Sequence, residues 1–159
     1  MMGREVLARV APLVVAALLA AGCGARPAAR TEPPAREWVA NARGVVQQLR
    51  NDILAVSGFD DVAAARRGLR DDSQMYGLLV AYTDFGGCRH MAASVGGRPS
   101  GPARVVRLLH RVCAHLQRAD ALFTRAVARK APQLLVGATR QAVAAVPELD
   151  AATVELARS

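Results

Sequence analysis

Aromatic residues are scarce in this chain of 159 residues, which has one tryptophan, two tyrosines and three phenylalanines. A core with so few rings has to be built mainly from leucine, valine and alanine, which pack between helices more readily than they fill a β-sandwich. The chain also lacks any segment in which apolar and polar residues alternate with the period of two typical of a strand. These deficits argue against an all-β fold, and the length supports one domain of ordinary size.

The chain also lacks an apolar run long enough to cross a membrane. Its longest uncharged apolar run, residues 10–22, has 13 residues, whereas a transmembrane helix needs about 20. The run follows Arg4 and Arg9 and ends just before Cys23. A charged segment followed by a short apolar run is typical of a cleaved secretory signal, so we expect residues 1–22 to be removed on export.

The end of this signal carries a recognisable motif. Residues 19–23 read LAAGC, which resembles the lipobox of bacterial lipoprotein precursors, where small residues precede an obligatory cysteine. Ala20 stands where that family most often has leucine. The resemblance covers only the first 23 residues. It implies that diacylglycerol is attached to the sulfur of Cys23, that the signal is cut just before it, and that the chain is anchored on the extracytoplasmic side of the cell membrane.

From Cys23 onward the chain divides into two segments of different composition. Residues 23–35 combine the anchor with a segment of three prolines and no apolar period, which predicts a spacer. From Arg36 to residue 159, apolar residues recur at intervals of three and four, which predicts helices. We expect a short helix through Arg67 and long helices over about 38–57, 72–96, 102–130 and 132–157. Pro147 either kinks the last of these or starts a new one. Mostly short connections predict an all-α, up-down helical bundle of about four long helices.

Once Cys23 is acylated, two cysteines are left. In an oxidising compartment, Cys88 and Cys113 are most simply paired in a disulfide between two antiparallel helices. The alternative is a metal site, because His90, His110 and His115 lie on the same predicted hairpin and add possible ligands. Positions 88 and 90 diverge on a regular helix, which disfavours shared coordination, although the glycines at 86 and 87 leave it open.

Positive charge is concentrated in one segment. Residues 98–130 contain eight of the 21 basic residues but only one of the 13 acidic ones. On a helix, six of these arginines fall within about 60° of arc, opposite the apolar residues. They are Arg104, Arg107, Arg111, Arg118, Arg125 and Arg129. No acid lies among them to form pairs along the helix. The row therefore predicts a face for an anionic partner, with a plain solvated face as the alternative.

For a membrane-tethered chain, the nearest polyanions are lipid headgroups and phosphate-bearing wall polymers, and an envelope protein is a further candidate partner. We expect no nucleic acid as a partner, since aromatic side chains for base stacking are few.

On the apolar side of the arginine-rich helix, Asp120 is expected to form a buried pair with Arg89 on the preceding helix. Such a pair fixes helix register more often than it does chemistry.

No serine–histidine–aspartate order, paired-carboxylate motif or HExxH sequence is present. We therefore expect a non-enzymatic protein without a cofactor, whose bundle is a binding or assembly module. Two alternatives stay open. One is a carrier of a small apolar ligand or lipid between the helices, and the other is a metal-binding protein that uses the cysteine–histidine hairpin.

Overall fold

The computed structural model describes residues 35–95 and 102–159, which are almost entirely helical. The predicted signal, Cys23 and the spacer up to residue 34 lie outside the described residues. The helices are α2 (Ala35–Ser57), α3 (Val62–Gly68), α4 (Asp72–Val95), α5 (Ala103–Arg129), α6 (Pro132–Val143) and α7 (Val146–Ala157).

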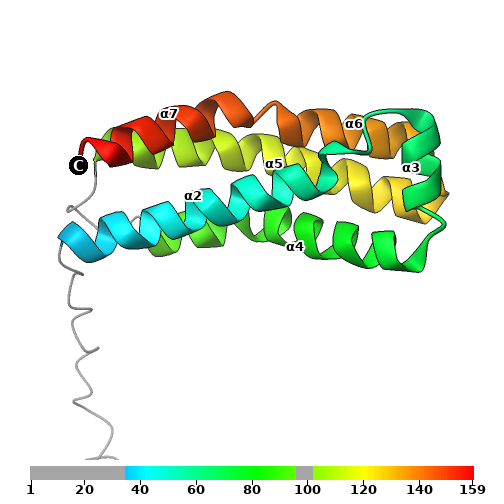
Figure 1. The fold of residues 1–159 in the computed structure, drawn as a ribbon, viewed down its shortest axis with the longest axis horizontal. Helices are drawn as coiled ribbons and strands as arrows, with labels where there is room; N and C mark the ends of the chain where they lie inside the picture. Colours follow the sequence, from blue (N-terminus) through cyan, green and yellow to red (C-terminus); the bar gives the residue numbers. More distant parts are fainter. Residues whose placement is uncertain (1–34, 96–101) are drawn as a thin grey trace, which may run out of the picture. The chain divides into compact units, whose positions relative to one another are not determined.

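The long helices form the predicted up-down bundle (Figure 1). α5 packs against α4 on one side and against α6 and α7 on the other, and α2 likewise packs against α4, α6 and α7. α6 and α7 follow one another along the same side and together take the place of a fourth long helix. The short α3 crosses one end of the bundle, where it contacts α6 and α4. The all-α bundle predicted from the apolar spacing is confirmed.

Local sequence sets where these helices begin. The Asp61 carboxylate accepts hydrogen bonds from the amides of Ala63 at 2.7 Å and Ala64 at 2.9 Å, and so caps α3. The Asp71 carboxylate accepts from the amide of Ser73 at 2.9 Å and caps α4 in the same way. Each cap satisfies amide groups that have no partner inside the first helical turn.

The structure decides between the two roles left open for Pro147. α6 ends at Val143 and α7 begins at Val146, so Pro147 starts a separate helix. It stands in the first turn of α7, where a missing backbone N–H breaks no helical hydrogen bond.

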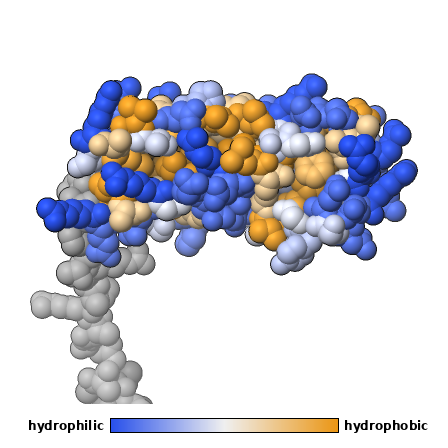
Figure 2. Space-filling view, in the orientation of Figure 1, coloured by the Kyte–Doolittle hydropathy of each residue, from blue (hydrophilic) through white to orange (hydrophobic). Residues whose placement is uncertain are grey.

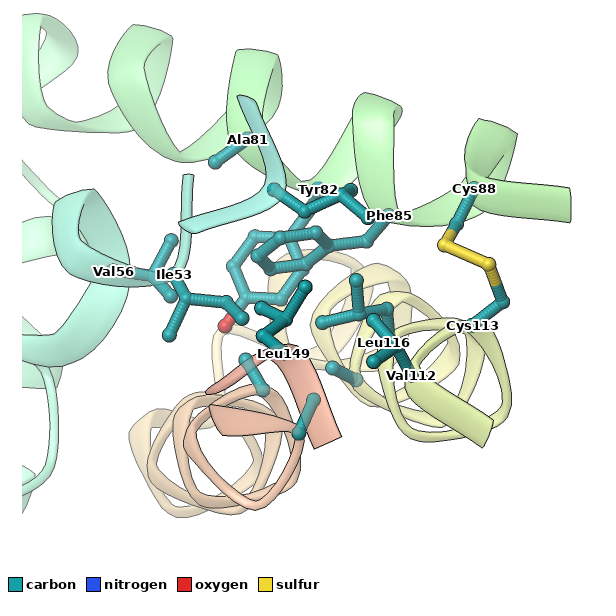
Figure 3. Close-up of a cluster of buried hydrophobic side chains, with 14 of the residues drawn as sticks. Ile53, Val56, Ala81, Tyr82, Phe85, Cys88, Val112, Cys113, Leu116 and Leu149 are labelled. Carbon is teal, nitrogen blue, oxygen red and sulfur yellow. A yellow bond between two sulfur atoms is a disulfide. The ribbon is translucent and has the colours of Figure 1, made fainter. Parts of the chain in front are cut away.

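Four of the six aromatic side chains are buried in the core, namely Trp38, Tyr82, Phe85 and Phe123, whereas Tyr76 is exposed. The rings of Tyr82 and Phe123 stack with centroids 4.2 Å apart, and Phe85 meets Tyr82 edge to face at 5.1 Å (Figure 3). Burial raises the pKa of Tyr82 to about 12, so its phenol stays neutral. Some large apolar side chains of these helices are exposed, among them Leu79 at 47% and Val127 at 37%. Each follows a buried neighbour, and a rotation of about 100° per residue turns it outward.

The predicted disulfide is confirmed. Cys88 in α4 and Cys113 in α5 are bonded, with their Cα atoms 5.3 Å apart, and both are fully buried (Figure 3). Because the bond joins two helices that run in opposite directions, it fixes the register of α4 against α5.

Candidate functional site

The side chains of α5 are divided sharply between an inner and an outer face. Its buried residues are Val105, Leu108, Leu109, Val112, Cys113, Leu116, Ala119, Phe123 and Ala126. All six arginines of the predicted row are exposed on the outer side. We call this row, made of Arg104, Arg107, Arg111, Arg118, Arg125 and Arg129, the α5 arginine stripe. Contacts with α4, α6 and α7 hold the inner face in place, so the stripe is presented on a helix with a fixed orientation.

The arginine at one end of the stripe forms an ion pair with an acid. Arg104 Nη1 lies 3.2 Å from Glu155 Oε1 of α7, and the same carboxylate lies 3.5 Å from Arg158. Among the residues that the structure describes, the other five arginines of the stripe form no ion pair. They extend from Arg107 to Arg129, a distance of about 33 Å at 1.5 Å per residue.

Two arginines of the stripe are held by their own helix. Arg118 Nε donates to the carbonyl oxygen of Ala114 at 3.0 Å, and Arg125 Nε donates to that of Ala121 at 3.1 Å. Each bond uses one donor of the guanidinium group and leaves the terminal amino groups facing solvent. A planar guanidinium with free terminal donors can grip a phosphate or carboxylate with two parallel hydrogen bonds.

The expected pair between Arg89 and Asp120 is wrong. Arg89 is exposed, because Cys88 just before it points inward to its disulfide partner. Asp120 lies instead against Gly86 of α4, where an added Cβ would stand 3.1 Å from its Oδ2 atom. Burial raises the pKa of Asp120.

A pair of carboxylates that the sequence did not predict lies between α2 and α4. Gln48 Nε2 donates to Asp52 Oδ1 at 3.2 Å and to Asp84 Oδ2 at 3.1 Å, so one amide bridges both acids. Asp52 is only 7% exposed. Burial raises the pKa of Asp52 to about 6, with a further contribution from the neighbouring charge of Asp84. The sequence did carry a signal, since Asp52 stands beside Ile53 on the apolar side of its helix.

This pair of carboxylates should make the stability of the bundle depend on pH. The pKa of Asp52 lies above its unfolded value of 3.8, so the stabilisation that its protonated form contributes is complete below about pH 4 and is lost as pH rises through about 6. Asp52→Asn should therefore raise the free energy of unfolding at pH 7.5 by about 1–2 kcal/mol, allowing for solvent screening of the half-buried partner Asp84. Urea denaturation at pH 4 and pH 7.5 measures this gain.

Asp60→Asn is the matched control, because it removes the same charge from an exposed loop position. It should change stability little at either pH. A loss of stability in Asp52→Asn at pH 7.5, or an equal gain at pH 4, would contradict the raised pKa as the cause.

The cysteine–histidine hairpin does not provide the ligands that a metal site would need. Both thiols are used in the disulfide, and His90 and His110 are exposed. Within residues 35–95 and 102–159, no three side chains of histidine, cysteine, aspartate or glutamate come together in a way that could hold a metal ion.

None of the described helices is both long and apolar enough to span a membrane. The chain matches no protein-family model, and no curated protein or solved structure is significantly similar to it.

Proposed function

We propose that the chain is an extracytoplasmic lipoprotein, anchored to the membrane through Cys23, whose helical body is a non-enzymatic binding or assembly module. The α5 arginine stripe is the surface that meets its anionic partner. The observation that carries the proposal is the row of five exposed arginines, from Arg107 to Arg129, without an ion pair to any described acid.

The arrangement of charge favours a ligand over a plain solvated surface. Arginines spaced four residues apart on one helix repel one another and reduce its stability. A polyanion laid along the stripe would remove that repulsion and supply several phosphate groups to guanidinium donors. Arg104, which Glu155 already contacts, is the least available member of the row.

The anchor and the stripe support each other in this proposal. The lipobox-like motif at residues 19–23 is the basis for proposing a lipid on Cys23, and a tethered body stays close to anionic headgroups and wall polymers. Tethering raises the effective concentration of these polyanions around the bundle, so weak contacts at each arginine suffice. Each basic side chain near an anionic surface contributes about 1 kcal/mol.

The carrier function is the second candidate, and one observation favours it. A groove of about 500 Å³ lies between α2 and α7, with Val46 and Leu156 among its lining residues, which falls within the usual range for small-molecule sites of about 300–1,000 Å³. Two polar contacts at this groove make it less suitable for an apolar ligand. Arg50 forms an ion pair with Asp150 at its edge, and Arg43 donates to the carbonyl oxygen of Leu156 at 2.8 Å.

The test is binding of residues 35–159 to vesicles, without the lipid anchor. The protein should sediment with phosphatidylglycerol vesicles and not with neutral phosphatidylcholine vesicles. Binding should weaken steeply between 0.1 M and 1 M salt, as the Debye length falls from ~10 Å to ~3 Å. A variant in which Arg107, Arg111, Arg118 and Arg125 are all changed to glutamine should lose about 4 kcal/mol, or roughly a thousandfold in affinity.

The matched control changes four exposed arginines outside the stripe, Arg36, Arg67, Arg89 and Arg140, one on each of α2, α3, α4 and α6. It removes the same net charge and should lose much less binding. If both variants lose binding equally, the stripe contributes only through the overall positive charge of the protein. Equal binding to both kinds of vesicle would contradict the anionic-partner function.

A further inference from the structure

A second basic feature lies at the end of the bundle that α3 covers, where Figure 2 shows hydrophilic side chains gathered. A cavity of about 690 Å³ opens there between α3 and the turn from α5 to α6. It is lined by Arg66, Leu69, Arg70, Lys130, Pro132 and Gln133. Three cationic side chains and no acid form its lining, and it is separate from the α5 arginine stripe and from the α2–α7 groove.

The fold holds these three cations in place from different segments. Arg66 belongs to α3, and Arg70 follows that helix by two residues. The ring of Phe59 fixes this helix against the bundle, because it occupies the space where a Cβ at Gly68 would stand. Lys130 ends α5 in the left-handed conformation, with φ at 49°, and this turns the chain toward Pro132 at the beginning of α6.

No acid is among the residues that line the cavity. The acids nearest in sequence are Asp61, which caps α3, Asp71, which caps α4, and Asp72 in the first turn of α4. Across residues 35–95 and 102–159, neither Arg66, Arg70 nor Lys130 forms an ion pair with an acid. Three like charges around one concave space repel one another, and an anion inside the cavity would relieve that repulsion.

We propose that this cavity binds a phosphate group carried on a small organic moiety. A phosphate monoester has a charge of about −1.5 to −2 at pH 7 and three acceptor oxygens, so it matches three cations better than a carboxylate does. Arg66 and Arg70 bind the phosphate oxygens through paired donors, while Lys130 acts as a point charge. A cavity of this volume has room for more than the phosphate, and Leu69 and Pro132 contact the organic part.

The experiment is titration of the full chain, in a non-ionic detergent, with glycerol phosphate, measured by calorimetry at about 0.15 M salt, where the Debye length is about 8 Å. Glycerol phosphate should bind, whereas glycerol and acetate should not bind measurably. Lys130→Gln should weaken binding about tenfold, as expected for loss of one charge-assisted contact. Arg66→Gln and Arg70→Gln should each weaken it by at least as much, because each removes paired donors. The triple variant should lose binding. Circular dichroism checks that its helices are intact, as expected for positions that are exposed.

A matched triple variant separates this site from the proposed function. Arg111→Gln, Arg118→Gln and Arg125→Gln remove the same charge from the α5 arginine stripe and should leave glycerol phosphate affinity within about twofold at the salt used. If both triple variants lose binding equally, or if acetate binds as tightly as glycerol phosphate, the cavity is not a phosphate site. If the stripe binds no vesicles while the cavity variants still lose glycerol phosphate, only the proposed function fails.

The same variants identify where the phosphate comes from. With residues 35–159, which lack the proposed anchor, and vesicles that contain phosphatidic acid, the cavity triple variant binds more weakly than the unsubstituted segment if the phosphate belongs to a lipid headgroup. If the cavity substitutions affect glycerol phosphate alone, the ligand is a free phosphorylated molecule. Either result supports the site, provided that glycerol phosphate binding is lost in the cavity variant and kept in the stripe variant.

Discussion

Replacing Cys88 and Cys113 together by alanine should lower the free energy of unfolding by about 3.5 kcal/mol, as expected when a crosslink over 25 residues is removed. The crosslink restricts the unfolded chain, and its loss makes unfolding more favourable. Both side chains are fully buried, so the missing sulfur atoms also leave small voids in a core with few rings. Urea denaturation of the oxidised chain and of the double variant measures the difference.

Reductant supplies the control for this prediction. The unsubstituted chain in the presence of dithiothreitol should approach the stability of the double variant, while the double variant should not respond to dithiothreitol. The intact mass of the oxidised chain should be lower by two hydrogens than that of the reduced chain. Equal stability of the oxidised chain and the double variant would contradict a stabilising role for the bond.

Cys23→Ser should either release the protein from the membrane or leave it as an uncut precursor, since serine offers no thiolate for acylation. Two acyl chains anchor a protein stably because each buried CH₂ contributes about 0.8 kcal/mol, whereas one chain binds only marginally. In membrane fractionation, the unsubstituted chain should stay in the pellet after a high-salt wash and move to the detergent phase. The variant should appear either as a released protein or as an uncut precursor that keeps residues 1–22.

Gly24→Ser is the control for this second prediction, because it places a hydroxyl at the next position and leaves the thiol intact. It should be processed and retained like the unsubstituted chain. A Cys23→Ser chain that is cut and nevertheless withstands the high-salt wash would show that another part of the protein binds the membrane, and the lipid anchor would then have to be abandoned.

Several features of the fold followed from short-range patterns. Apolar spacing of three and four predicted the long helices. The pairing of Cys88 with Cys113 followed from the antiparallel arrangement of two neighbouring helices. The exposure of the arginines on α5 followed from the rotation per residue alone. Each of these inferences needs only one helix or two consecutive ones.

The incorrect or missing inferences depended on contacts between distant segments. The expected pair of Arg89 with Asp120 failed because the direction of Cys88 turns its neighbour outward. The bridge of Gln48 to Asp52 and Asp84 joins α2 to α4. The ion pair of Arg104 with Glu155 joins α5 to α7. The periodicity of a single helix contains no information about which polar side chain of another helix stands opposite.

The sequence by itself therefore determined that this protein is helical and that α5 has one cationic side, and it favoured the pairing of Cys88 with Cys113 that the structure contains. It also carries the lipobox-like motif on which the proposed anchor rests. Only the tertiary structure decided that Pro147 starts a separate helix, that Asp52 and Asp84 meet, and that Arg66, Arg70 and Lys130 surround one cavity. The reason is physical: helix formation and amphipathicity are set by neighbours within about four residues, whereas cavities and charge pairs between helices depend on the packing of the whole bundle.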